Sequence, residues 1–380
     1  MNDKEKFLIR WRKIEQFFKH RIMRFLEDRI GRPVMQPDDV DWKSIERILI
    51  IRPQDQMGDF LLATPAIRAL RNRFPEARIG IVVKDYFADT MINSEFVNDV
   101  LIFCRSGRDW TLKKLRTLWK KLRNRWDLAV VLSSESHSLT ADVLVHLSGA
   151  KYGLGSERDI FGGCTRNFMY NLLAPDSKTG LHQTERNLDI VRHIGAGTDD
   201  LSEAVHVSEE EKQTLRQRYS EIYEQNGPVI GLHIGANKPE NRWPIENFVE
   251  LTARLKANGM DNLAVYWGPQ EQDLADTFFS RADFDVQRIP PSSLRNQIIH
   301  FSLCDVAVCN DTGVMHLCAS VGTPLAAIFG PTDPRYWKPI GDSFVAIRNP
   351  DHQVLNVSVD DVYNTILELL WRKEDKATDR

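Results

Sequence analysis

The chain has 380 residues, of which 42% are hydrophobic and 27% charged, and its formal net charge is −3. This length exceeds that of one ordinary domain, and the composition is typical of a soluble globular protein. The small negative charge argues against a general nucleic-acid binder, so we expect no nucleic-acid partner. The odd number of cysteines, five without a Cys-x-x-Cys pair, argues against a disulfide framework and favours the cytoplasm.

The first 30 residues predict a basic amphipathic helix, and we assign residues 1–44 to an N-terminal helical extension. Such a helix can lie on an anionic membrane surface or dock on the protein's own first domain, and both remain open. Charges interrupt the segment too often for a secretory signal, and no run approaches the roughly 20 apolar residues of a membrane-spanning helix. We therefore expect a cytoplasmic protein, either free or peripheral on the inner face of the cytoplasmic membrane. The apolar positions of the predicted N-terminal helix are Phe7, Trp11, Ile14, Phe18, Ile22 and Phe25.

From residue 45 onward, short apolar runs alternate with amphipathic segments, a pattern typical of a parallel sheet covered by helices on both faces. These elements would form a first domain over residues 45–200. The expected strands are 47–51, 78–83, 100–103 and 128–132, and the expected helices are 60–74, 110–125 and 140–148.

The predicted helix at 110–125 carries large apolar residues and many lysines. We expect the apolar residues to share one face that covers the sheet, and the lysines to form an exposed positive face that would suit a phosphorylated lipid acceptor. The expected buried face consists of Leu112, Leu115, Trp119, Leu122 and Trp126.

The second half of the chain repeats this plan after a polar stretch around 195–211, which we expect to be a linker. It would form a second domain over residues 201–350, and the two domains would face one cleft. Residues 359–371 predict a helix, and the segment 351–380 could pack back on the first domain. The expected strands are 228–233, 263–267, 286–289, 306–309 and 324–329, with helices at 244–258, 271–281 and 294–301.

The loop between the first strand and the first helix ends in Met57-Gly58-Asp59. Ligands bind at such strand-to-helix loops in this architecture, and Gly58 would let a substrate approach the backbone. Asp59 could act as a general base, or it could only cap the helix that follows. The glycine spacing is not that of a dinucleotide-binding loop, which disfavours a nicotinamide dehydrogenase.

A second strand-to-helix loop spans residues 233–244 and carries Lys238 and Arg242. Backbone N–H groups near Gly235, together with a cation, could neutralise phosphate charge as a leaving group departs. The alternative is a solvated loop that Trp243 anchors. A candidate anion site later in the chain favours the first interpretation.

That anion site is the segment from Asp311 to His316, which follows a buried strand. The strand breaks at Asp311-Thr312-Gly313, and a helix begins near Gly313, so its first N–H groups point out of the sheet edge toward anionic oxygens. Thr312 adds a hydroxyl, and His316 lies one turn later on the same helical face. These groups indicate a diphosphate clamp, with an N-capped helix and a buried histidine as the alternative.

Three motifs, in this order, resemble those of glycosyltransferase family 9, which contains the ADP-heptose:lipopolysaccharide heptosyltransferases. The likeness runs from about Arg47 to Gly341. A further segment, 182–188, is similar to the one that precedes the linker in that family. The three motifs are 57–59 with 63–70, 231–236 with 242–244, and 311–316 with 330–334.

The resemblance implies an α/β protein with the GT-B fold, in which two Rossmann-like domains place parallel sheets around a central cleft. The first domain would bind the acceptor, and the second a nucleotide sugar whose sugar is transferred with inversion. The resemblance places the base on Asp59. Asp311 would hold the turn or the donor sugar, and Glu271 resembles the family's ribose-binding acid, although a glutamate that only complements a helix dipole is the alternative. The implied donor-binding residues are Lys238, Arg242, Glu271, Asp311, Thr312, Gly313 and His316.

One position departs from the family pattern. The family usually has Lys before the Arg/His-Trp-Pro of its second motif, and this chain has Asn241, so Lys238 is the expected substitute. The resemblance implies a monomeric enzyme that moves a heptose from ADP-heptose to a lipopolysaccharide core or another glycolipid or oligosaccharide acceptor, without metal or cofactor. The alternative is a catalytically weak or inactive relative that binds nucleotide sugar or scaffolds envelope glycan assembly.

Overall fold

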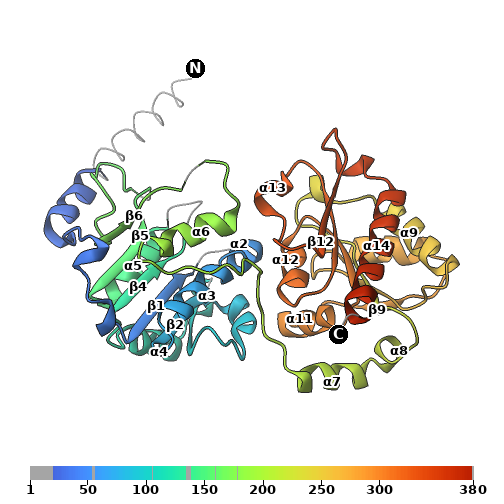
Figure 1. Ribbon diagram of the computed structural model, residues 1–380, viewed down its shortest axis with the longest axis horizontal. Helices are drawn as coiled ribbons and strands as arrows, with labels where there is room; N and C mark the ends of the chain where they lie inside the picture. The colour runs from blue at the N-terminus through green and yellow to red at the C-terminus, as the bar shows by residue number, and fades with distance from the viewer. Residues whose placement is uncertain are drawn as a thin grey trace. The chain divides into compact units, whose positions relative to one another are not determined.

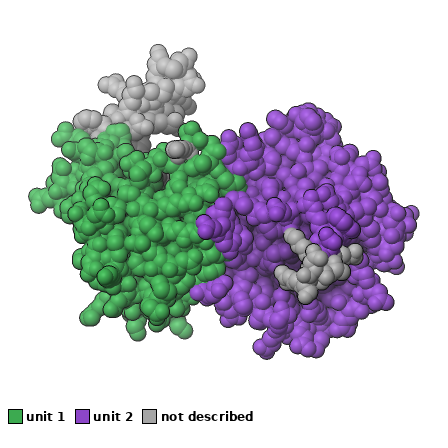
Figure 2. Space-filling model, in the orientation of Figure 1, with its two compact units in different colours: residues 1–54, 66–85, 96–198 green, residues 55–65, 86–95, 199–380 purple. Residues whose placement is uncertain are grey.

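The computed structural model describes residues 20–53, 56–104, 106–133, 138–158, 160–177 and 179–378. The chain forms two compact units, coloured separately in Figure 2. Each unit is built on one six-stranded sheet in which the recorded strand pairs are parallel (Figure 1). Unit 1 comprises residues 1–54, 66–85 and 96–198, and unit 2 comprises 55–65, 86–95 and 199–380.

The sheet of unit 1 has the strand order β3-β2-β1-β4-β5-β6. Its first four strands lie where continuous apolar runs predicted them, and β1 is buried at the centre because such runs can be covered on both faces. The sequence did not predict β5 or β6. The strands are β1 (Arg47–Arg52), β2 (Arg78–Lys84), β3 (Asp99–Phe103), β4 (Leu128–Val131), β5 (Tyr152–Ser156) and β6 (Leu172–Ala174).

The predicted helix at 60–74 is two helices, α2 (Met57–Leu61) and α3 (Thr64–Arg73). Pro65 has no N–H for the carbonyl of Leu61, so the Thr64 hydroxyl donates to that carbonyl instead, at 2.7 Å. The break leaves α2 as a short helix, and it belongs to unit 2. The remaining helices and 3₁₀ turns before residue 195 are α4 (Leu112–Leu122), α5 (Leu139–Ser148), α6 (Gln183–Arg192), η1 (Pro37–Asp39), η2 (Trp42–Ser44), η3 (Asp85–Met91) and η4 (Gly107–Asp109).

Helix α4 does not bury the face that the sequence predicted. Leu118 and Leu122 are buried in the core of unit 1, together with Trp126 of the following turn. Leu118 was not among the expected core residues, but it lies one turn before Leu122 and therefore shares its face. Leu112, Leu115 and Trp119 remain exposed, so three of the five residues of the predicted covering face are not buried against the sheet.

The described part of the N-terminal extension, residues 20–30, is helical and contacts unit 1. Met23 and Leu26 pack against the core of that unit, and the Glu27 carboxylate accepts hydrogen bonds from the backbone N–H and the hydroxyl of Thr165. Residues 1–19 of the predicted amphipathic helix lie outside the described residues. Within the described ranges, no helix is long and apolar enough to span a membrane.

The sheet of unit 2 has the order β12-β11-β10-β7-β8-β9, and only β12 was not predicted. Strand β10 lies between β7 and β11 and is buried along its whole length. The strands are β7 (Ile230–His233), β8 (Leu263–Tyr266), β9 (Gln287–Ile289), β10 (Val306–Asn310), β11 (Leu325–Phe329) and β12 (Phe344–Arg348).

Helices on both faces of this sheet complete unit 2. Helices α9 to α12 and the start of α14 follow the predicted pattern, whereas α7, α8 and α13 were not predicted. The helices and 3₁₀ turns are α7 (Glu209–Arg218), α8 (Ser220–Tyr223), α9 (Ile245–Ala257), α10 (Gln272–Arg281), α11 (Leu294–Ser302), α12 (Gly313–Ser320), α13 (Pro334–Trp337), α14 (Val359–Thr378), η5 (Pro239–Asn241) and η6 (Val354–Asn356).

The C-terminal helix α14 contributes its buried residues to the core of unit 2. Val362, Ile366 and Leu369 recur at helical spacing on one face, and that face lies in the same core as β8 and β10. The Arg254 guanidinium of α9 stacks over the Tyr363 ring at 4.1 Å from its centroid. The segment that the sequence allowed to pack back on the first domain is therefore part of the second core.

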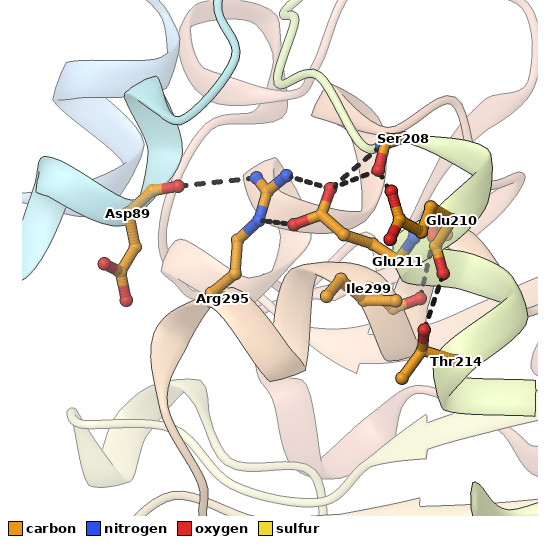
Figure 3. A network of polar contacts seen from close by, with 8 residues as sticks. Asp89, Ser208, Glu210, Glu211, Thr214, Arg295 and Ile299 are labelled. Carbon is orange, nitrogen blue, oxygen red and sulfur yellow. Dashed lines mark hydrogen bonds and ion pairs between the residues drawn. The ribbon is translucent and has the colours of Figure 1, made fainter.

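The end of the predicted linker is held to unit 2 by an ion pair (Figure 3). The Arg295 guanidinium of α11 donates two hydrogen bonds to the Glu211 carboxylate of α7, at 2.7 and 2.6 Å. It also donates to the backbone carbonyl of Asp89 at 3.4 Å. Through this pairing Arg295 lowers the pKa of Glu211 to about 2. The polar stretch 195–211 thus ends in a helix that is fixed to unit 2.

Candidate functional site

Loops from four adjacent strands of the unit 2 sheet meet at its carboxyl edge, where ligands bind in this architecture. The buried Asn310 side chain, at the end of β10, joins two of them. Its Nδ2 donates to the Gly235 carbonyl at 3.0 Å, and its Oδ1 accepts the backbone N–H of Trp243 at 3.0 Å. The sequence analysis missed Asn310, although a polar residue closing an apolar strand was a visible signal.

Thr312 is the N-cap of α12, and its hydroxyl oxygen accepts the backbone N–H of Val314 at 3.1 Å. The N-capped helix that we considered as the alternative is therefore present. It does not exclude ligand binding, because the Thr312 hydroxyl keeps its own proton to donate. The first turn of α12 also directs backbone N–H groups out of the sheet edge, starting at Gly313.

Asn241 contacts the same turn. Its Nδ2 donates to the backbone carbonyl of Asp311 at 3.1 Å and to the Asp311 carboxylate at 3.0 Å. The side chain is buried, and its Oδ1 has no hydrogen-bond partner among the described residues. The position that usually holds a lysine thus holds a neutral amide that orients Asp311.

The two cations of the loop after β7 differ in their surroundings. The half-buried Arg242 turns back on its own loop, where its Nε donates to the Ala236 carbonyl at 2.6 Å. Lys238 is exposed at the start of η5, and its ammonium has no recorded partner within the described part of the chain. Lys238 is therefore the mobile positive charge of this loop, whereas Arg242 shapes the loop.

Asp59 lies inside α2 as the third residue of that helix, and Gln56 is the N-cap. The alternative that Asp59 caps the following helix is therefore wrong, because α2 begins two residues earlier. Its side chain is partly exposed. An acidic residue in the first turn also interacts favourably with the positive end of the helix dipole.

Helix α2 packs directly on α12, and glycines on both helices permit this contact. A Cβ on Gly58 would lie 2.7 Å from Cδ2 and 3.0 Å from Nε2 of His316. A Cβ on Gly313 would lie 3.0 Å from Cβ of Met57. Both distances are shorter than ordinary contacts, so the helix that carries Asp59 can meet the candidate clamp only because these positions have no side chain.

His316 is buried, and three carboxylates surround it. Its Nδ1 lies 2.8 Å from Oε1 of Glu203. Burial alone would lower the pKa of His316, but Glu203, Asp311 and Asp59 together raise it above its ordinary value. The histidine is buried, as our alternative expected, yet its environment favours the charged imidazolium.

Glu203 is the site residue that the sequence analysis missed. It lies in the predicted linker, its side chain is only 1% exposed, and its second oxygen has no partner among the described residues. Burial raises the pKa of this carboxyl. No motif marked Glu203, because its only recorded partner lies 113 residues later in the chain.

Glu271 occupies the carboxyl edge of the sheet between β7 and β8. Its Oε2 accepts the backbone N–H of Gly268 at 2.6 Å, and its carboxylate covers Gly235 so closely that a Cβ there would overlap it. Glu271 is the N-cap residue of α10, but its buried side chain makes no cap hydrogen bond to that helix. Nearby, burial lowers the pKa of His233, whose Nε2 lies 3.9 Å from Glu271.

The structure thus brings most of the candidate residues to one edge of unit 2. Asn241 and His316 contact the turn and the helix that Thr312 begins, and α2 brings Asp59 to the same helix. A carboxylate near an imidazolium and a helix N-terminus can combine proton transfer with stabilisation of an anionic leaving group.

Known proteins are similar to this chain in sequence and in fold. The lipooligosaccharide heptosyltransferase 2 of Haemophilus influenzae is 23% identical over 335 residues, which cover 82% of this chain and 90% of the relative. A crystal structure of a glycosyl transferase family 9 protein from Veillonella parvula superposes with a TM-score of 0.75 at 19% identity, covering 86% and 97% of the two chains. The E. coli ADP-heptose LPS heptosyltransferase II superposes with a TM-score of 0.70 at 21% identity, covering 86% and 99%.

These two solved structures support the expected GT-B-like fold, here seen as two α/β units with parallel sheets. The family model described as glycosyltransferase family 9 (heptosyltransferase) matches residues 115–365, which include the second and third of the three motifs. The chain therefore belongs to glycosyltransferase family 9, the heptosyltransferase family.

Proposed function

We propose that this glycosyltransferase moves a heptose from ADP-heptose to a lipopolysaccharide core or a related glycan, with inversion at the anomeric carbon. The printed names of the Haemophilus and E. coli relatives support the choice of sugar, donor and acceptor class. The observation that carries the proposal is the packing of α2, with Asp59, on α12, whose N-terminus is the candidate diphosphate site.

The donor would bind at the carboxyl edge of the unit 2 sheet. The Thr312 hydroxyl and the backbone N–H of Gly313 donate to the diphosphate oxygens, and the Lys238 ammonium adds a positive charge. The buried Glu271 carboxylate accepts hydrogen bonds from the ribose hydroxyls. Asp311, which Asn241 orients, faces the transferred sugar.

Asp59 then acts as the general base. It takes the proton of an acceptor hydroxyl while that oxygen forms a bond to the anomeric carbon, and the bond from this carbon to the diphosphate breaks on the opposite face. The transition state has oxocarbenium character, as in other glycosyl chemistry. ADP leaves with the bonding electron pair, and its growing negative charge is met by the donors of the α12 N-terminus. We propose that this chemistry needs no divalent metal, so activity should persist in EDTA.

Glu203 orients His316, and together they place a positive charge beside α2 and α12. Glu203 accepts a hydrogen bond from Nδ1–H of His316, and the resulting imidazolium presents its other edge to α2. A positive charge at this place favours the ionised form of carboxylates around it and the anionic leaving group. Glu203 acts through His316 and is a positioning residue.

The acceptor would be a glycolipid or oligosaccharide at the inner face of the cytoplasmic membrane, reached by a monomeric enzyme from the cytoplasm. The basic residues of the N-terminal extension and of α4, both in unit 1, support an anionic acceptor or surface.

Thermal unfolding with a panel of nucleotide sugars tests the donor. A ligand that binds only the folded protein raises Tm in proportion to ln(1 + [L]/Kd). We expect ADP-heptose to raise Tm by clearly more than UDP- or GDP-sugars do at equal concentration. In Thr312→Val most of this increase in Tm should be absent. A larger shift with a UDP- or GDP-sugar would overturn the donor assignment.

A catalytically weak relative that binds nucleotide sugar remains the second candidate. The specific observation in its favour is the neutral Asn241 side chain at the usual lysine position, hydrogen-bonded to Asp311 instead of carrying a positive charge. Donor binding without transfer in the wild-type protein, together with transfer by Asn241→Lys, would select this candidate.

A further inference from the structure

Helix α4 exposes a stripe of large apolar side chains. Leu112 is 74% exposed, Trp119 is 52% exposed and Leu115 is 47% exposed. These fractions are unusual for a helix that covers a sheet, because such residues normally supply the buried face. The helix has a separate buried face in Leu118 and Leu122, so the exposed stripe is not needed to hold α4 on unit 1.

The stripe lies between the buried face and a basic face. Successive helical residues are turned by about 100°, so Leu115, Trp119 and Leu112 fall within about 60° of one another. The basic side chains follow the stripe around the helix, on the side away from the buried face. In angular order they are Arg123, Arg116, Lys120 and Lys113.

The charge around this helix has one sign. Residues 111–125 contain seven Lys and Arg residues and no Asp or Glu. The Arg123 guanidinium stacks 5.6 Å from the centroid of the Trp119 ring, at the edge of the stripe. Lys113, Arg116 and Lys120 are exposed and have no ion pair recorded within the described ranges. These three charges are therefore available to a partner.

We propose that α4 is a docking surface for an anionic lipid bilayer. The stripe of Leu112, Leu115 and Trp119 would enter the boundary between headgroups and acyl chains, where apolar side chains are removed from water, while Arg116, Lys120 and Lys113 pair with lipid phosphates. A second copy of the chain fits less well, because two such helices would bring like charges together. This inference rests on the proposed location at the inner membrane face, and it is independent of the donor chemistry.

Vesicle flotation without any nucleotide sugar tests this surface. The vesicles contain phosphatidylethanolamine with 30% phosphatidylglycerol, and phosphatidylcholine vesicles serve as the neutral comparison. The test variant is Leu112→Ser/Trp119→Ser. The matched control is Leu355→Ser/Trp371→Ser, which removes a leucine 63% exposed and a tryptophan 65% exposed from unit 2. A charge variant, Arg116→Glu/Lys120→Glu, tests the electrostatic part.

We expect wild type and the Leu355/Trp371 control to bind the anionic vesicles equally and the neutral ones weakly. The Leu112/Trp119 variant should lose at least tenfold in partition coefficient, and so should the charge variant and the wild type in 0.5 M salt. All variants should keep the wild-type Tm, because the altered residues are exposed. The Leu112/Trp119 variant should also keep the transfer rate to a soluble, delipidated acceptor, because it leaves the basic residues and the proposed donor site intact.

Three results would overturn the proposal. The first is vesicle binding at the wild-type level by the Leu112/Trp119 variant. The second is a loss of vesicle binding in Ile22→Ser/Phe25→Ser instead, a variant that removes two residues 57% exposed on the helix at 20–30. The third is a concentration-dependent dimer by light scattering that only the Leu112/Trp119 variant abolishes, since this would assign the stripe to a protein interface. If the donor is not ADP-heptose, the flotation result should be unchanged, because the vesicles are tested without nucleotide sugar.

Discussion

Nδ1 of His316 lies 2.8 Å from Oε1 of Glu203, which joins helix α12 to the end of the segment that precedes α7. The opposite edge of the same ring lies against Gly58 of α2. One buried imidazole of α12 therefore contacts two segments that are far from it in the sequence. We propose that the protonated ring is a fixed part of the site, held by these contacts and by the loops beside it.

Gly58→Ala should disturb the contact between α2 and α12. The new Cβ would lie 2.7 Å from Cδ2 of His316, so the ring or the helix must move, and we expect the free energy of unfolding to fall by about 1–3 kcal/mol. The transfer rate should fall as well, because Asp59 is the next residue. Gly107→Ala is the matched control, since a Cβ there meets nothing within 4 Å. Urea unfolding of both variants checks the prediction, and equal stability would contradict the close packing.

Glu203→Gln should lower the pKa of His316, because it removes the carboxylate that does most to raise it. The imidazolium would then lose its proton at a lower pH, and the alkaline limb of the kcat/KM profile should move to lower pH. Donor affinity at pH 6 should change little. A fall in activity that is uniform across pH would indicate a purely structural role, and Glu203→Asp should restore part of the wild-type profile.

The same pair sets a pH dependence of stability. The folded protein holds the His316 proton more tightly than the unfolded chain, so this stabilisation is complete below about pH 6.5 and is lost as the pH rises through the higher folded pKa. The raised pKa of Glu203 acts in the same direction. Urea unfolding at pH 6 and pH 9 should show a smaller decrease for Glu203→Gln than for wild type.

Lys238→Ala should slow transfer by about ten- to a hundredfold, because it removes the mobile positive charge near the departing diphosphate. The exposed Lys43 of unit 1 offers a control, Lys43→Ala, that should leave kcat unchanged. Adding Asn241→Lys to Lys238→Ala should restore part of the lost rate, because the new ammonium would lie beside Asp311 at the same turn. Steady-state ADP release measures each effect. An unchanged rate in Lys238→Ala would exclude the proposal that Lys238 takes over the role of the lysine that the family usually has at position 241.

Arg295→Ala should destabilise unit 2 by about 2 kcal/mol, since it leaves the Glu211 carboxylate without its charged partner. The depressed pKa of Glu211, about 2, means that this stabilisation is present above about pH 4.5 and is lost as the pH falls toward 2. Glu211→Gln should therefore flatten the acid limb of the stability profile. The exposed pair of Arg281 and Glu246 supplies the control, and Arg281→Ala should cost less than about 0.5 kcal/mol.

The sheets could be predicted because their central strands carry continuous Val, Ile and Leu runs, as in residues 48–51. Strand β5 was missed because its sequence, Tyr-Gly-Leu-Gly-Ser, contains two glycines, which are rare in strands. Gly155 is needed there because the Tyr170 ring lies against it. That requirement comes from a loop 15 residues later, so local patterns could not reveal it.

In the candidate site too, features set by local sequence could be predicted, and contacts between distant residues could not. The turn at Thr312 and Gly313 could be predicted, since a hydroxyl and a glycine between a strand and a helix indicate locally where the helix begins. The contact of Glu203 with His316 and that of Asn241 with Asp311 could not, because each joins residues at least 70 positions apart. For α4, helical spacing identified the apolar residues but not which of them the sheet would cover.

The proposal that Asp59 is the base of a heptosyl transfer can be decided by kinetics with ADP-heptose and a lipopolysaccharide core acceptor. ADP release and sugar transfer should be measured for wild type, Asp59→Asn and the exposed control Asp285→Asn. We predict transfer by wild type and the control, and a loss of about 10²- to 10⁴-fold in kcat for Asp59→Asn with donor binding retained. Binding of ADP-heptose without turnover by the wild type, or undiminished turnover by Asp59→Asn, would contradict the claim.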